Sequence, residues 1–166
     1  FDLEEMEGEP CMIGLDLASR RDLAALVAVF RSEEKWRIWS RFWLPAARVR
    51  EVKTVPYQEW VDRGWIVETP GDIIDLDMIE DEIIDFASRF EIIEGAHDPF
   101  QATQLVTHLM DRGIKMVEVG QGFRTMSEPM KVLDALIRDG KVEHCGNGCM
   151  AWNIANTQAR MIGGDH

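Results

Sequence analysis

The chain has 166 residues, 46% of them hydrophobic and 29% charged, which fits one globular domain, and no apolar run approaches the ~20 residues that span a bilayer. Three cysteines, an odd number, argue against a disulfide framework, and the acidic N-terminal stretch is not a signal peptide, so we expect a cytoplasmic protein. The formal charge of −12 argues against a free-standing nucleic-acid binder, although a catalytic domain tethered to a DNA-gripping partner could be acidic.

The first part of the chain predicts three consecutive strands. Residues 1–10 are expected to form a flexible acidic leader, and residues 11–166 a single domain. An apolar run at 11–18 predicts the first strand, a continuous apolar run at 23–30 a buried second strand, and alternating residues at 36–44 a third. Because the connections are short, these strands are expected to form an antiparallel meander.

The rest of the chain predicts helices alternating with strands. Pro56 and Gly64 delimit a short helix, followed by a brief extended piece at 65–67, and Asp75 is expected to cap a helix that ends near Phe90. Later elements are predicted as a strand at 91–96, a helix at 101–112, a strand at 115–119, and helices at 126–139 and 150–161. The helix at 126–139 is expected to turn five apolar side chains inward: Met126, Met130, Leu133, Leu136 and Ile137.

This order of elements predicts an α/β fold. Three antiparallel strands continued by two parallel strands give a mixed five-stranded sheet flanked by helices. A helix must connect the meander to the strand at 91–96, so that strand is expected to pair beside the first one. Ligands of such sheets bind beyond the carboxyl ends of the strands.

The first strand contains one carboxylate among apolar residues. With a period of two, Ile13, Leu15 and Leu17 share one face, and Gly14 and Asp16 share the other. An unsatisfied buried polar group costs about 2–7 kcal/mol, so a cation or hydrogen bonds should hold Asp16. Gly14 leaves open space beside it.

A second carboxylate, Asp98, follows the strand at 91–96 and is expected near Asp16. Two carboxylates about 4 Å apart repel by roughly 4 kcal/mol at an effective dielectric constant near 20, a conflict that a divalent cation removes. Mg²⁺ and Mn²⁺ prefer carboxylate oxygens, and a pair of such ions can promote phosphodiester cleavage. The adjacent His97 is interpreted as a structural, hydrogen-bonded histidine.

A series of motifs, in order along nearly the whole chain, resembles the C-terminal nuclease domain of tailed-bacteriophage terminase large subunits. The motifs are Gly14-Leu-Asp-Leu-Ala, Asp22-Leu-Ala-Ala-Leu, Phe42-Trp-Leu-Pro45, Val67-Glu-Thr-Pro-Gly71, His97-Asp98-Pro99, Val119-Gly-Gln-Gly122 and Ala151-Trp-Asn-Ile-Ala-Asn156. The resemblance implies an RNase H-like fold and metal-dependent cutting of concatemeric double-stranded viral DNA in the cytoplasm of an infected bacterial host.

The resemblance also implies the site. By position, Asp16 and Asp98 match the family's catalytic residues and the ligands of two Mg²⁺ or Mn²⁺ ions. The family's third acid lies on a later helix and is missing from the pattern here; Asp165 or His166 could replace it, and otherwise the chain lacks a C-terminal segment.

Four further residues are candidates for positions near the site or the substrate: Gly14, Gln121, Asn153 and Asn156. Asp22 is interpreted as a cap rather than as a loop carboxylate beside the metals. His144, Cys145 and Cys149 could suggest a zinc knuckle, but no second pair of ligands lies nearby in the sequence, which favours a Gly-rich turn.

The expected partners follow from the same resemblance. No phosphate-binding loop of the Gly-x-x-x-x-Gly-Lys-Ser/Thr type occurs, so ATP binding is not expected here, and an ATPase domain of the same full-length protein is expected upstream. Double-stranded DNA, the portal and the small terminase subunit are the other expected partners. Two alternatives remain: another RNase H-like nuclease of the resolvase or integrase type, or a non-catalytic acidic docking module that binds packaging proteins.

Overall fold

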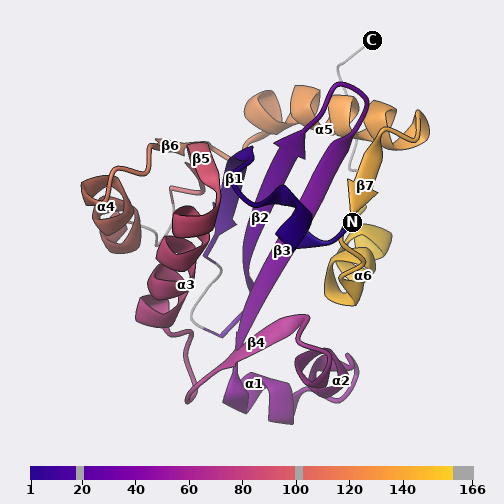
Figure 1. Cartoon of the computed structure of the whole chain (residues 1–166). Helices are drawn as coiled ribbons and strands as arrows, with labels where there is room; N and C mark the ends of the chain where they lie inside the picture. Colours follow the sequence, from indigo (N-terminus) through magenta and orange to yellow (C-terminus); the bar gives the residue numbers. More distant parts are fainter. Residues whose placement is uncertain (18–20, 100–102, 159–166) are drawn as a thin grey trace.

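The computed structural model describes residues 1–17, 21–99 and 103–158, and shows one sheet with helices on both faces (Figure 1). In the described residues the sheet has seven strands in the order β4-β3-β2-β1-β5-β6, with β7 also paired to β3. The strands are β1 (Pro10–Asp16), β2 (Ala24–Arg31), β3 (Trp36–Pro45), β4 (Ile66–Thr69), β5 (Glu91–His97), β6 (Met116–Glu118) and β7 (Val142–His144). The helices are η1 (Leu3–Met6), α1 (Ala46–Glu51), α2 (Tyr57–Asp62), α3 (Leu76–Arg89), α4 (Thr103–Asp111), α5 (Phe123–Arg138) and α6 (Gly148–Asn156).

The expected mixed sheet is confirmed. Strands β1, β2 and β3 form an antiparallel meander, and β5 pairs in parallel with β1 and with β6. The sheet has two more strands than the five expected, because β4 and β7 both pair with β3. With four and three residues, these two strands are too short to show a period of two in the sequence.

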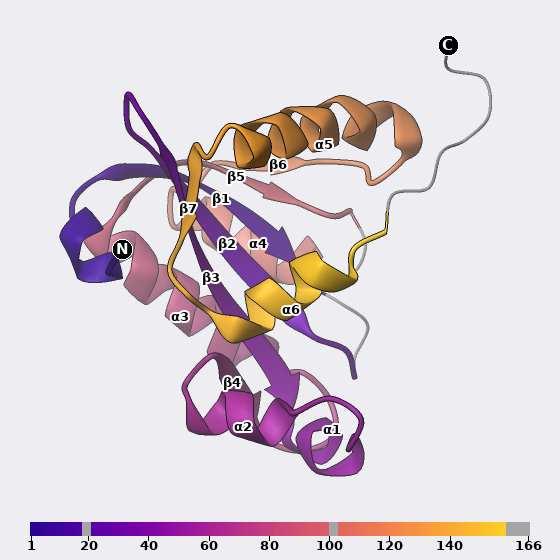
Figure 2. The same cartoon turned by 90° about the vertical axis from the view of Figure 1, so that its right-hand side faces the viewer.

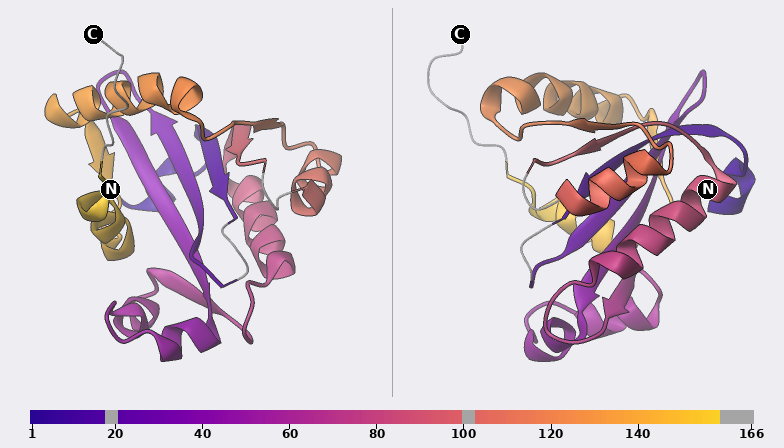
Figure 3. Two further views of the ribbon diagram at one scale, coloured as in Figure 1. Left: turned by 180° about the vertical axis from the view of Figure 1, so that it is seen from behind. Right: turned by 90° about the vertical axis from the view of Figure 1, so that its left-hand side faces the viewer.

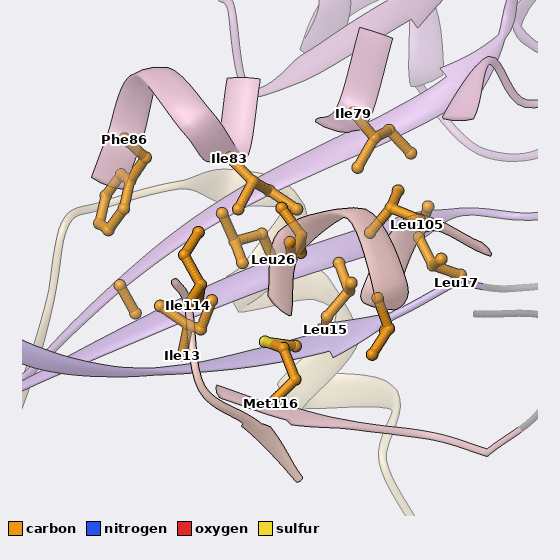
Figure 4. Close-up of a cluster of buried hydrophobic side chains, with 14 of the residues drawn as sticks. Ile13, Leu15, Leu17, Leu26, Ile79, Ile83, Phe86, Leu105, Ile114 and Met116 are labelled. Atoms are coloured by element: carbon orange, nitrogen blue, oxygen red, sulfur yellow. The ribbon is translucent and has the colours of Figure 1, made fainter. Parts of the chain in front are cut away.

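One face of the sheet is covered by α3 and α4. Asp75 caps α3 as expected, accepting a hydrogen bond from the Met78 N–H at 3.1 Å. Figure 4 shows how Ile79 and Ile83 of α3 and Leu105 of α4 meet the alternate side chains of β1 and β2. The two helices lie side by side, with His108 Nδ1 2.8 Å from Glu80 Oε2 (Figure 3). This face holds the main hydrophobic core.

The opposite face of the sheet is covered only in part. Near β3 and β4, a smaller apolar cluster joins Phe42, Ile66, Val49 of α1, Trp60 of α2 and Cys149 of α6. Figure 2 shows α5 and α6 on this side, opposite α3. Strand β2, expected to be continuously buried, therefore alternates between buried and half-buried residues.

Helix α5 corrects one expectation. None of its side chains is buried, although the apolar stripe predicts a core helix. Met130, Leu133 and Ile137 are 45%, 44% and 48% exposed. A helical repeat of apolar residues shows that a helix is amphipathic, but does not show whether another element covers the apolar side. In this structure the side chains of α5 remain largely open to solvent.

The N-terminal residues also differ from the flexible leader that was expected. They form η1, with Met6 buried in the main core. The Gly8 N–H donates to the Arg89 carbonyl at 2.9 Å, and Arg89 Nε donates to Glu7 Oε1 at 3.0 Å. These bonds attach the segment to the end of α3. Among the described residues, no helix has the length and apolar character needed to cross a membrane.

Candidate active site

The parallel pairing of β1 with β5 brings Asp16 and Asp98 together. Gly14 pairs with Ala96 and Leu15 with His97, the last pair of the register. Asp16 is the last residue of β1, and Asp98 directly follows the last residue of β5. The negative charge of Asp98 acts on the Asp16 carboxyl, so the two side chains lie near each other. The two carboxylates therefore share the carboxyl end of two neighbouring strands, where α/β sheets commonly bind ligands.

The electrostatics of Asp16 reflect this arrangement. Partial burial raises the pKa of the Asp16 carboxyl above its usual range, and the negative charge of Asp98 raises it further. Both effects disfavour the ionised form of Asp16, as expected for neighbouring carboxylates without a compensating cation. A bound cation would reverse the balance, because it stabilises both ionised groups.

The exposure of Asp16 corrects the sequence-based argument. Its side chain lies on the exposed face of β1 with Met12 and Gly14, and is not enclosed among apolar residues. The reason is that α3 and α4 cover only the other face, so the acid remains accessible. The open space expected beside it is confirmed: a Cβ added to Gly14 meets no atom within 4 Å.

Comparison with known proteins now identifies the family. A family model described as "Terminase large subunit, endonuclease domain" matches residues 1–165. The chain belongs to this family. The terminase resemblance inferred from the motifs is thereby confirmed.

Individual relatives agree with the family assignment. "Protein YmfN" of Escherichia coli (strain K12) is 31% identical over 98% of the chain, and the "Terminase, large subunit" of Enterobacteria phage HK97 is 32% identical over 79% of it. The crystal structure of the HK97 bacteriophage large terminase superposes on 86% of the chain with a TM-score of 0.75 and 29% identity. The large terminase of a thermophilic bacteriophage, at 9% identity and a TM-score of 0.54, shares the fold. The chain spans 38% and 27% of the lengths of the two curated relatives.

The other candidate residues of this terminase endonuclease domain make local hydrogen bonds or are exposed. His97 Nδ1 lies 2.9 Å from the Asp98 carbonyl oxygen, a structural bond. Asn153 donates to the Cys149 carbonyl at 2.9 Å and Asn156 to the Trp152 carbonyl at 2.8 Å, both within α6. Gln121 is exposed between β6 and α5. Asp165 and His166 lie outside the described residues.

The segment considered as a zinc knuckle instead contains an asparagine that orders α6. Asn147 is buried, accepts hydrogen bonds from the Cys149 and Met150 N–H groups, and donates to the carbonyls of Ser40 and Trp65. It therefore caps the helix and ties it to β3. The sequence signal was an Asn directly before a helix start, which the Gly-rich pattern around it obscured.

The remaining loop candidate, Asp22, lies near α1 and α2. Burial raises the pKa of the Tyr57 hydroxyl, the Arg48 guanidinium lowers it, and the Cys149 thiol and the Asp22 carboxylate raise it by smaller amounts. The Asp22 carboxylate is thus close enough to Tyr57 of α2 to affect the pKa of its hydroxyl.

Asp16 and Asp98 are the candidate donors of the site. In the described part of the chain, no group of three or more His, Cys, Asp or Glu side chains is placed to hold a metal ion. Two hard oxygen donors suit Mg²⁺ or Mn²⁺, which keep several water ligands. Burial and, to a smaller extent, the charge of Asp98 raise the pKa of Asp16, and a bound divalent cation would favour its ionised form.

Proposed function

We propose that this terminase endonuclease domain cuts concatemeric double-stranded DNA in a metal-dependent reaction during viral DNA packaging. The observation that carries the proposal is that Asp16 ends β1 and Asp98 directly follows β5, its parallel neighbour, close enough for the charge of Asp98 to raise the pKa of Asp16. The family description, which names an endonuclease domain, and the HK97 terminase relative support the same role.

Asp16 and Asp98 would hold Mg²⁺ or Mn²⁺ through their carboxylate oxygens. When bound, such a metal pair would supply an activated water and stabilise the leaving oxygen. The part played by the chain is to hold both carboxylates on one face, while Gly14 keeps space for a phosphate beside them. A third ligand would come from Asp165, from His166, or from elsewhere in a longer polypeptide.

The proposed partners follow from the terminase family. Double-stranded DNA is the substrate, and an ATPase domain of the same full-length protein, the portal and the small terminase subunit complete the packaging machine in the cytoplasm of the infected host. Such partners would help an acidic domain, with a formal charge of −12, to hold its substrate.

Plasmid nicking in Mn²⁺ or Mg²⁺ tests the proposal. The assay compares this chain and a longer polypeptide that contains it, each as wild type, Asp16→Asn and Asp98→Asn. Both variants are expected to lose at least about 100-fold in rate, more than is typical for residues that only support metal ligands. The matched control is Asp134→Asn, which removes an exposed acid that pairs with Arg138 on α5.

The outcomes separate the alternatives. Cleavage by wild type that EDTA abolishes, together with loss in both site variants, supports the proposal. If the longer wild-type polypeptide never cleaves, the nuclease proposal is wrong and the acidic docking module is favoured. If Asp16→Asn cleaves like Asp134→Asn, the assignment of the site is wrong.

A further inference from the structure

One stretch of this acidic chain has more basic than acidic residues. Residues 36–57 contain five Lys or Arg side chains and one acid, Glu51, in a chain with 18 basic and 30 acidic residues. This segment covers β3, α1 and the start of α2. In the fold, three of its arginines pair with acids of other elements, and Arg48 pairs with Glu51.

At α1, the guanidinium groups of Arg21 and Arg48 meet at a single carboxylate oxygen of Glu51. Arg21 Nη2 lies 3.0 Å from Glu51 Oε2, and Arg48 Nη1 lies 3.6 Å from the same oxygen. The side chains of Arg21, Arg48 and Glu51 are 53%, 38% and 54% exposed. The two arginines come from separate parts of the chain, the connection before β2 and helix α1, so the fold brings them together.

This cluster lies at the same end of the sheet as Asp16. Asp16 is in register with Ala25 of β2, and Arg21 is only four residues before Ala25, at most about 14 Å of extended chain away. The charges of Asp22 and Arg48 both act on Tyr57, so the connection before β2 lies close to α1 and α2. The start of β2 also pairs with the end of β3, from which α1 continues (Figure 2).

We propose that Arg21 and Arg48 bind a backbone phosphate of the DNA substrate, next to the phosphate that is cut at Asp16 and Asp98. This inference rests on the proposed function. Duplex DNA carries a phosphate every 3.4 Å of axis on each strand, so a strand leaving the cleavage position passes the cluster within a few nucleotides. Two guanidiniums directed at one oxygen provide the fork-like donors that phosphate recognition requires.

When DNA is absent, the Glu51 carboxylate occupies the position that the phosphate would take. Its Oε2 occupies the position where both guanidiniums meet, and it keeps them in place when DNA is absent. Exposed ion pairs are weak, so a phosphate can replace the carboxylate. The nearby acids Asp22 and Glu51 reduce the attraction for DNA, and removing the charge of Glu51 should therefore strengthen binding.

The test measures binding of a short duplex by fluorescence anisotropy over a series of salt concentrations. The proteins are wild type, Arg21→Ala/Arg48→Ala and Glu51→Gln. The matched control is Arg138→Ala, which removes an arginine of another exposed ion pair, with Asp134 at 2.8 Å on α5. Circular dichroism checks that all variants fold.

The double variant is expected to bind DNA at least about tenfold more weakly, and the slope of log K against log salt should fall in magnitude by about 1, because one neutralised phosphate is lost. Glu51→Gln should bind more tightly than wild type, and Arg138→Ala should match wild type. If wild type does not bind the duplex, or the double variant matches Arg138→Ala, the inference is wrong.

Asp16→Asn separates this inference from the proposed nuclease function. This variant should lose cleavage and keep DNA binding, whereas the double arginine variant should lose binding and show a raised KM for cleavage. If wild type does not cleave DNA but the double arginine variant still binds DNA more weakly than wild type, the proposed function is contradicted and the phosphate site is supported.

Discussion

Gly14 and Asp16 lie on the same exposed face of β1, two residues apart, with empty space above the Gly14 Cα. Gly14→Ala is therefore expected to fold as well as wild type, or to gain about 0.5–1 kcal/mol, because alanine loses less backbone entropy in a strand. Gly14→Leu should also fold, but its side chain would occupy the space beside Asp16 and reduce metal-dependent cleavage. Urea unfolding and plasmid nicking measure the two effects, and equal cleavage by the leucine variant would refute a substrate role for this space.

Gly95 provides the opposite case on the neighbouring strand β5. A Cβ at this position would overlap Met116 Sδ and lie 3.0 Å from Ile13 Cγ1. Gly95→Ala is expected to lower the free energy of unfolding by about 1–3 kcal/mol, the usual cost of overpacking a core. Urea unfolding compares the stability of Gly95→Ala with that of Gly14→Ala. Equal stability of the two alanine variants would show that the flexible end of Met116 moves aside at little cost.

The exposed side chains of α5 lead to a stability prediction. Ile83→Ala on α3 should cost about 2–5 kcal/mol, because Ile83 is fully buried in the main core. Leu133→Ala on α5 should change the stability of this chain by less than about 0.5 kcal/mol, as at other exposed positions. Thermal or urea unfolding checks both variants, and a cost at Leu133 near that at Ile83 would show that α5 packs onto the sheet.

The sequence predicted those parts of the fold that depend on local periodicity and on short connections. The meander, the capped helix α3 and the pairing of β5 beside β1 all followed from such patterns, and the pairing was enough to place Asp98 near Asp16. The exposure of Leu133 and of Asp16 could not be predicted, because apolar spacing does not reveal which face of an element is covered. The meeting of Arg21 and Arg48 at Glu51 joins residues far apart in sequence, which single-sequence patterns do not report.

The three cysteines should react at different rates. Burial raises the pKa of the Cys11 thiol to about 11 and that of the Cys149 thiol to about 12, so both remain protonated and shielded at neutral pH. Cys145 is only half-buried. A disulfide reagent such as DTNB is expected to modify one thiol quickly in the native protein and all three in denaturant. Cys145→Ser should remove the fast phase; a fast phase that persists in this variant would contradict the burial of the other two.

The raised pKa of Asp16 predicts how stability depends on pH. The folded protein keeps the Asp16 proton at a pH where the unfolded chain, with a pKa near 3.8, has already lost it. In that range the folded state binds more protons, so the contribution of Asp16 to stability falls as the pH rises and stays unfavourable at neutral pH. Removing the negative charge of Asp16 should therefore raise the free energy of unfolding of the metal-free protein at neutral pH.

Asp16→Asn is accordingly expected to be more stable than wild type at pH 7 in EDTA, and the difference should shrink as the pH falls below 3.8. In an Asp98→Asn background, the gain in stability from Asp16→Asn should be smaller, because the Asp98 charge is one cause of the raised pKa of Asp16. Adding Mn²⁺ should stabilise wild type and leave Asp16→Asn nearly unchanged, since binding to the folded state alone raises stability. Urea unfolding across this pH range measures each effect, and an Asp16→Asn variant less stable than wild type at pH 7 in EDTA would show that the ionised carboxylate is already compensated within the protein.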